Sequence, residues 1–407
     1  MYYDIITGII GIIILVFFYM KTKSVDSNQQ QPLLINETST TTSFGPKEFK
    51  KKKPTILIVT MDGGGMRGII TIGILQKLKE LLGTDITNDC HMMCGTSTGG
   101  LLSIARAIDL EYSYLRDFYI RLGANIFGNP LENLFNHGTL ANQVELKKEL
   151  EQIQLLTGKN LSQFVQNKKL FVVACGKEID SNSGFESVLI KNYGTEHQQM
   201  SVVQSLLATS AAPCYFPSVK IGTQKFIDGG AINNNPTFLA YIEAKELYPL
   251  KDYNYVIVSL GTGGIDSKAP SLPKKPKTNS TPKPPKSLGD SSLGTINNVI
   301  DNVGNASNNI SDSSNDILKI GNDVMKGIAN SHKQHCHFMN YISGNNDGVQ
   351  YYRFNPELKK SIKLQDTSKE ALKAMDEAVD NFMKDQKVKE MIIDLKKSLS
   401  KVSPTPA

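Results

Sequence analysis

The sequence predicts an α/β domain in which helices cover the faces of a mostly parallel central sheet. A β-branched run at 56–60 leads into a glycine-rich loop, and apolar residues at helical spacing follow at 70–82. A second short apolar run ends near Gly95 and passes directly into another helical pattern. Continuously apolar runs at 170–174 and 255–260 are typical of strands buried on both faces. This alternation indicates parallel strands joined by helices.

Length and composition fit a globular protein with at least one sizeable core. The chain has 407 residues, of which 40% are hydrophobic and 21% are charged, so it can hold one large domain or two ordinary ones. Its 5 cysteines are an odd number at wide spacing. That usage favours reduced thiols over a disulfide framework.

An apolar segment stands at the N-terminus, before the predicted domain. A helix over 2–20 would be about 30 Å long, which is the thickness of the hydrocarbon core of a bilayer. We expect residues 1–20 to be a transmembrane anchor. A cleaved signal peptide fits less well, because Asp4 and no basic residue precedes the run, and a core helix is rarely so long and so near a terminus. Lysines after the run predict that the remainder faces the cytosol.

Composition divides the rest of the chain into four parts. Residues 21–53 are polar and end in the lysine block 50–53, which indicates a flexible tether. The lysines either attract anionic lipid headgroups or only set the membrane topology. Residues 54–265 form the main globular domain, and 266–330 are a low-complexity insertion rich in Pro, Lys, Ser and Asn. Residues 331–407 are expected to add a strand and helices that pack on the main domain.

The pattern Gly95-Thr96-Ser97-Thr98-Gly99 is that of a nucleophile elbow. A serine hydroxyl is a poor nucleophile unless it is held in the open beside a base, and a sharp strand-to-helix turn does this. Gly95 and Gly99 let the strand and the helix approach closely. The helix N-terminus would place partial positive charge where an oxyanion forms. Five residues alone are weak evidence, so neighbouring motifs must decide.

Two other segments supply the remaining parts of such a site. The loop Gly63-Gly64-Gly65 begins a helix, so its unobstructed amides can approach an acyl oxygen, and the charge of Arg67 would support the loop. Asp228-Gly229-Gly230 follows a short strand, where the carboxylate can accept the serine proton. No histidine stands in an evident loop-end motif, so a Ser-His-Asp triad would lack its middle member.

On these motifs the chain resembles the patatin-like phospholipase family. Asp62-Gly63-Gly64-Gly65-Met66-Arg67-Gly68 is similar to the oxyanion loop of that family, Gly95 to Gly99 to its nucleophile elbow, and Asp228-Gly229-Gly230 to its catalytic aspartate motif. The resemblance is close over about 54–264 and looser in the C-terminal part. It implies a three-layer α/β/α patatin-like fold, a catalytic dyad of Ser97 and Asp228, and no metal or other cofactor.

The resemblance also implies a function. We expect a membrane-anchored serine lipid acyl hydrolase of the phospholipase A type, with a role in lipid degradation. Its substrate would be a membrane phospholipid or another acyl lipid, its other partner the bilayer, and no nucleic acid is expected. A lipid acyltransferase with the same dyad and a non-catalytic lipid-binding protein remain as alternatives.

Two other patterns indicate different chemistry. Gly63-x-Gly65-x-x-Gly68 fits a dinucleotide-binding fingerprint with Asp85 as the acid, but Asp85 does not end a second apolar strand, as that motif requires. The histidines and the cysteine at 332–337 could suggest a metal site. They lack a partner set at zinc spacing, so surface histidines are favoured.

Overall fold

The computed structural model describes residues 53–264 and 331–404, with short gaps at 129–131, 134–135, 137–138, 166, 182, 198 and 346–347. The predicted anchor at 1–20, all of the predicted tether except its last residue, and the insertion at 266–330 lie outside the described residues. Among the helices within these two ranges, none has the length and apolar character that a membrane span requires.

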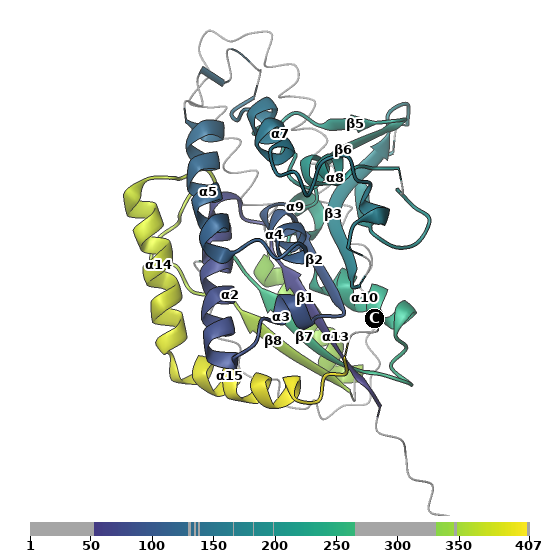
Figure 1. Cartoon of the computed structure of the whole chain (residues 1–407), viewed down its shortest axis with the longest axis vertical. Coiled ribbons are helices and arrows are strands. Elements are labelled where there is room, and N and C mark those ends of the chain that lie inside the picture. Colours follow the sequence, from purple (N-terminus) through teal and green to yellow (C-terminus); the bar gives the residue numbers. More distant parts are fainter. Residues whose placement is uncertain are drawn as a thin grey trace, which may run out of the picture. The chain divides into compact units, whose positions relative to one another are not determined.

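Strands and helices alternate along the described chain (Figure 1). The strands are β1 (Thr55–Met61), β2 (Met92–Thr96), β3 (Lys169–Glu178), β4 (Glu186–Lys191), β5 (Val219–Ile221), β6 (Gln224–Asp228), β7 (Asn254–Leu260) and β8 (Val349–Phe354). The helices are α2 (Gly68–Leu82), α3 (Ile86–Asp89), α4 (Thr98–Ala107), α5 (Tyr112–Phe127), α7 (Gln143–Glu151), α8 (Val202–Thr209), α9 (Gly230–Asn233), α10 (Thr237–Leu247), α13 (Ser331–Asn345), α14 (Lys369–Lys384) and α15 (Gln386–Leu399). Short 3₁₀ turns lie at η1 (Gly65–Arg67) and η2 (Leu161–Gln163).

The described strands form one 8-stranded sheet of mixed direction. Strands β3, β2, β1, β7 and β8 lie in that order and run parallel to one another. Strands β4 and β6 run antiparallel to β3, and β5 runs antiparallel to β6. The predicted α/β class with a mostly parallel central sheet is confirmed. The antiparallel end was not predicted, because an apolar run does not encode the direction of its strand.

Successive side chains of β1 enter two different cores, as the period of two in a strand requires. Leu57, Val59 and Met61 pack in the larger core with α2, α4, α5, α8, α14 and α15. Ile56 and Ile58 pack in the smaller core with α10 and α13. Helices therefore cover both faces of the sheet, and on one of them α2 packs against both α5 and α14 (Figure 1).

Strand β3 holds two other strands end to end along one edge. Strand β2 pairs with residues 169–173 of β3, and β6 pairs with residues 174–178. Strand β4 pairs with residues 171–176, which overlap both, so it occupies the opposite edge. Because β2 is parallel and β6 antiparallel to β3, their carboxyl ends meet between Val173 and Ala174. Residues that end these two strands are thereby brought together.

A buried ion pair joins the end of β1 to β8. Asp62 is 1% exposed and Arg353 is 4% exposed. Arg353 Nη1 donates to Asp62 Oδ1 and to Ser259 Oγ, each at 2.8 Å, and Nη2 donates to Asp62 Oδ2. Burial lowers the pKa of Arg353, but the charge of Asp62, its hydrogen bonds and the nearby Tyr351 together outweigh burial, so the net shift is upward. Because Asp62 precedes Gly63, this pair fixes where the glycine loop leaves the sheet.

Replacing Arg353 by methionine should destabilise the fold strongly. The variant leaves the Asp62 carboxylate buried without its partner, which typically costs about 3–5 kcal/mol. Arg116→Met is the matched control, because Arg116 binds Asp376 through side chains that are 33% and 49% exposed. An exposed pair of this kind contributes less than about 1 kcal/mol. Urea unfolding of both variants measures the difference, and equal losses would contradict the importance assigned to the buried pair.

Candidate active site

Ser97 lies at the turn from β2 to α4 in a backbone conformation that residues other than glycine rarely adopt. Its φ is 54° and its ψ is −123°. Its N–H donates to Thr209 Oγ1 at 3.0 Å, and the hydroxyl of Thr209 donates to the carbonyl of Val173. A buried side chain thus holds the strained turn. Strain of this kind persists where the surroundings over-determine it, as they do at many active sites.

The glycines that flank Ser97 lie where the strand and the helix touch. A Cβ on Gly95 would stand 2.0 Å from Gly99 O, and one on Gly99 would stand 2.2 Å from Met61 O. Neither position can therefore carry a side chain without moving the backbone. The glycine spacing predicted for a nucleophile elbow is thus a packing requirement of this turn.

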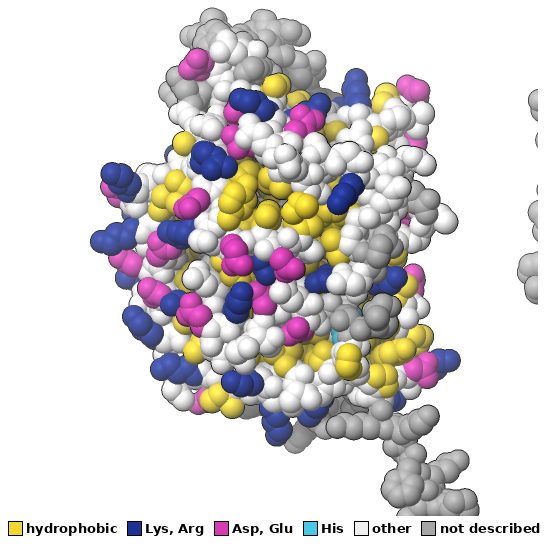
Figure 2. Space-filling model, viewed as in Figure 1, with side chains coloured by type: hydrophobic (Ala, Val, Ile, Leu, Met, Phe, Trp, Pro, Cys, Tyr) yellow, Lys and Arg dark blue, Asp and Glu magenta, His cyan; other side chains and the backbone are white. Residues whose placement is uncertain are grey.

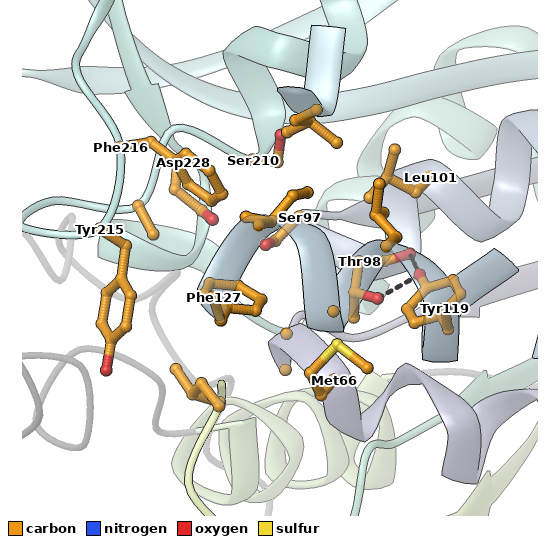
Figure 3. A pocket seen from close by; sticks show the side chains of 18 of the residues that line it. Met66, Ser97, Thr98, Leu101, Tyr119, Phe127, Ser210, Tyr215, Phe216 and Asp228 are labelled. Carbon is orange, nitrogen blue, oxygen red and sulfur yellow. Dashed lines mark hydrogen bonds between the residues drawn. The ribbon is translucent and has the colours of Figure 1, made fainter. Parts of the chain in front are cut away.

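Asp228 ends β6 and lies beside Ser97, because their strands meet on the edge of β3 (Figure 3). Asp228 Oδ1 accepts a hydrogen bond from Gly230 N at 2.7 Å. Oδ2 is buried and has no partner at normal hydrogen-bond geometry within the described part of the chain. This oxygen is therefore available to accept the proton of Ser97.

Burial gives Asp228 the properties of a base. The side chain is 1% exposed, and this burial raises its pKa to about 6, while the Ser97 hydroxyl and the Gly230 amide act in the opposite direction. The reference pKa of about 3.9 for an aspartate makes it a feeble base for a serine. A pKa nearer neutrality makes proton transfer more favourable. Burial thus makes Asp228 a stronger base than a solvent-exposed aspartate.

The glycine loop faces Ser97, but its three amides are not equivalent. Gly63 N donates to Asn234 O at 3.0 Å, so this amide is already engaged. Gly64 and Gly65 line the same cavity as Ser97. Of the three amides predicted to form an oxyanion hole, that of Gly63 is therefore occupied, and those of Gly64 and Gly65 remain as candidate donors. The Thr98 amide is a further candidate donor, since it belongs to the first turn of α4, whose amides have no partner within the helix.

Arg67 follows the glycine loop and holds it through hydrogen bonds. Its backbone N–H donates to Gly64 O at 3.2 Å, and its Nη1 donates to Gly263 O at 3.4 Å. Burial lowers the pKa of Arg67 to about 10, and the nearby charge of Asp62 acts in the opposite direction. Arg67 therefore remains protonated at neutral pH. Arg67 is not among the residues that line the cavity beside Ser97.

The other predicted motif glycines also stand at close approaches. Added Cβ atoms would lie 2.4 Å from Thr98 Oγ1 at Gly68, 2.3 Å from Val173 O at Gly229 and 2.9 Å from Asn234 Oδ1 at Gly230. All three therefore leave space for atoms that build the site.

An apolar cavity opens beside the dyad. Many of its lining side chains come from α5 and from the loop after α8. They include Leu122, Ile126, Phe127, Tyr215 and Phe216. Figure 2 shows hydrophobic side chains gathered around a hollow in this region of the surface. Such a lining suits a hydrocarbon chain and leaves the polar groups of the site at one end.

Histidine does not contribute to this cavity in the described part of the chain. His335 bonds Tyr351 OH at 2.9 Å, and burial lowers its pKa to about 3. Among the described residues, no group of three or more His, Cys, Asp or Glu side chains is placed to hold a metal ion. The arrangement around Ser97 is therefore a serine–carboxylate pair.

The dinucleotide interpretation fails at its acidic residue. Asp85 caps the short helix α3, where its carboxylate accepts from Thr87 N at 3.1 Å. The same carboxylate accepts from Arg106 Nη2 at 3.1 Å and from Tyr112 OH at 2.9 Å. Because it already has these partners and does not end a strand, Asp85 is a structural group.

Sequence reasoning assigned no role to four residues that build the site. These are Thr209, Asn234, Thr262 and Arg353. Each lies in a short segment that resembles the family outside its three main motifs, and that resemblance is the signal that could have pointed to them. That signal could not reveal the partner, because the partners lie 36 to 291 residues away.

Comparison with known proteins agrees with the motifs. A family model described as patatin-like phospholipase matches residues 59–241. The chain is 30% identical over 214 residues to a cGAMP-activated phospholipase of Pseudomonas aeruginosa, covering 51% of this chain and 62% of that protein. It is also 30% identical over 227 residues to calcium-independent phospholipase A2-gamma of Oryctolagus cuniculus, covering 52% and 28%. Residues 59–241 therefore match the patatin-like phospholipase family, and both of these relatives are phospholipases.

The similarity is partial in extent. The chain spans less than two thirds of the length of either relative. Among solved structures, VipD from Legionella pneumophila is similar with a TM-score of 0.37 and 14% identity, over 84% of this chain and 67% of that one. A likeness this weak supports no argument about the site.

The pKa of Asp228 predicts the pH dependence of catalysis. A base acts in its ionised form, so kcat/KM should fall about tenfold per pH unit below about pH 6 and level off above it. Stability should follow the opposite course. The pKa in the fold lies above the unfolded value of 3.8, so the contribution of Asp228 to stability is present below pH 3.8 and is lost as the pH rises through about 6.

Two measurements check this prediction. A pH–rate profile with a soluble ester gives the apparent pKa, and urea unfolding gives the stability. Asp228→Asn should abolish activity and be more stable than the wild type at pH 7. A variant that is less stable at that pH would contradict the assignment of a buried, unpaired carboxylate.

Proposed function

We propose that the protein is a serine lipid acyl hydrolase that cleaves acyl esters through the dyad of Ser97 and Asp228. The observation that carries the proposal is the buried Asp228 Oδ2, which has no hydrogen-bond partner among the described residues and lies beside a serine in a strained turn. The phospholipase relatives and the apolar cavity support an acyl lipid as the substrate.

The reaction would proceed through two transfers. Ser97 Oγ attacks the ester carbonyl carbon while its proton passes to Asp228, and the carbonyl oxygen becomes an oxyanion near the amides of Gly64, Gly65 and Thr98. Collapse of this intermediate expels the alcohol, which takes the proton back from Asp228. Water then attacks the acyl-serine by the same route, releasing the fatty acid and restoring both residues.

A serine-directed fluorophosphonate probe tests the nucleophile. We expect the wild type to label and to release fatty acid from phosphatidylcholine vesicles. Ser97→Ala should lose labelling and at least about 1,000-fold of the activity, because no nucleophile remains. Ser400→Ala is the control, since this exposed serine lies at the end of α15.

Two outcomes would redirect the proposal. A folded wild-type protein that does not label would indicate a non-catalytic lipid-binding protein. A labelled protein that forms a new ester when an alcohol or lysolipid acceptor is added would be an acyltransferase, because both reactions use the same acyl-serine.

We further propose that residues 1–20 anchor the enzyme in a membrane, with the catalytic domain on the cytosolic side. The support is the uncharged run at 5–20 and the lysines that follow it. An anchored domain would stay at the bilayer surface, where lipid esters lie, and would not have to bind the membrane from solution first.

Extraction of membranes at alkaline pH tests the anchor. The full chain should stay in the membrane pellet, and a variant without residues 1–20 should be released. Protease added to the cytosolic side should degrade the catalytic domain. Release of the full chain by high salt alone would contradict the proposal and would attribute binding to the lysine block at 50–53.

A further inference from the structure

The peptide group between Gly63 and Gly64 is held from two distant parts of the chain. Gly63 O accepts hydrogen bonds from Asn234 Nδ2 at 3.1 Å and from Thr262 Oγ1 at 2.9 Å. Gly63 N donates to Asn234 O at 3.0 Å. Asn234 and Thr262 are each 4% exposed, so water does not compete for these bonds. One carbonyl thus has two buried side-chain donors.

These bonds determine where the next amide points. The chain has no cis peptide bond among its described residues, so Gly63 C=O and Gly64 N–H point in opposite directions. With the carbonyl directed at Asn234 and Thr262, the Gly64 amide is directed away from them. Gly64 lines the cavity beside Ser97, and no described residue accepts a hydrogen bond from its amide.

We propose that Thr262 and Asn234 are positioning residues that orient the Gly63–Gly64 peptide so that the Gly64 amide donates to the oxyanion. This inference rests on the proposed hydrolase function and assigns two residues to it. Neither residue takes part in the transfer of the acyl group or of the proton. Each acts through the peptide that it holds.

The Gly63–Gly64 peptide needs such positioning because both of its residues are glycines. A peptide between two glycines can rotate with little steric cost, since neither residue has a side chain to oppose the motion. A rotated peptide would present a carbonyl oxygen to the developing negative charge. An oxyanion site is effective only if its donors are oriented before the reaction.

Hydrogen bonds hold the side chain of Asn234 in one orientation. Its Nδ2 also donates to Ser331 Oγ at 2.6 Å, so both amide protons are used. Ser331 begins α13, whose Gln334 accepts from Asn235 N at 2.8 Å and donates to Ile232 O at 2.7 Å. The loop that carries Asn234 is therefore fixed by the C-terminal part of the chain.

The test compares Thr262→Val with Thr262→Ser in the full-length protein. Valine keeps the shape of threonine and removes the donor, whereas serine keeps the donor. We expect Thr262→Val to lower kcat for a soluble p-nitrophenyl ester at least tenfold, with KM within about twofold of the wild type. Thr262→Ser should stay within about threefold of the wild type in kcat. Loss of a whole oxyanion donor typically costs about 100- to 1,000-fold.

A trifluoromethyl ketone supplies a readout that follows the oxyanion directly. Ser97 Oγ adds to its carbonyl carbon, the serine proton passes to Asp228, and the former carbonyl oxygen carries the charge. Its inhibition constant should rise in Thr262→Val by the same factor by which kcat/KM falls, as expected for a transition-state analogue. Asn234→Asp, which keeps the shape but places a carboxylate against Gly63 O, should lower kcat/KM further and raise the inhibition constant further. It provides a second variant if Thr262→Val folds poorly.

The outcomes separate this inference from the proposed function. An active wild type with an unchanged Thr262→Val would overturn the positioning role. Equal losses of activity in Thr262→Val and Thr262→Ser, with a lowered unfolding midpoint in both, would also overturn it and indicate packing alone. A folded wild type that neither hydrolyses esters nor reacts with the fluorophosphonate would instead overturn the hydrolase function.

Discussion

The site depends on the edge of β3 where two strands of opposite direction meet. One carries the nucleophile immediately after its last residue, and the other ends at the carboxylate. The gap between them exposes the carbonyl of Val173, which Thr209 satisfies while it also holds the Ser97 amide. A purely parallel sheet would bring no second strand end to this point. The antiparallel strand β6 is therefore what brings Asp228 beside Ser97 in this sheet.

Three buried aspartates show how surroundings decide the role of a side chain. Asp62 has Arg353 as a bidentate partner and anchors a loop. For Asp85, burial raises the pKa, but hydrogen bonds from Thr87 and Tyr112 and the charge of Arg106 outweigh it, so the net shift is downward. Asp228 has only one amide partner of normal geometry, and its pKa rises. Asp62 and Asp85 stabilise the fold. Asp228 stays buried at a cost in free energy, and the raised pKa that results suits a general base.

Much of the support for the site comes from beyond the region that the family model matches. Thr262, Ser331 and Arg353 all follow residue 241. They reach the glycine loop because β8 pairs with β7 and α13 covers α10. The candidate site, whose dyad residues lie within 59–241, is thus held in shape by residues that follow this region. The insertion at 266–330 separates the parts of this support in sequence.

The sequence alone was sufficient for the α/β class, the glycine turn around Ser97 and the acid after a short strand, because each is a local pattern of polarity, glycine and spacing. Only the tertiary structure showed that β6 runs antiparallel, that Gly63 is engaged and that Asp228 is buried. Strand direction, burial and pKa depend on residues far apart in the chain. Asp62 and Arg353, separated by 291 positions, illustrate why: no local pattern records a partner that long-range packing supplies.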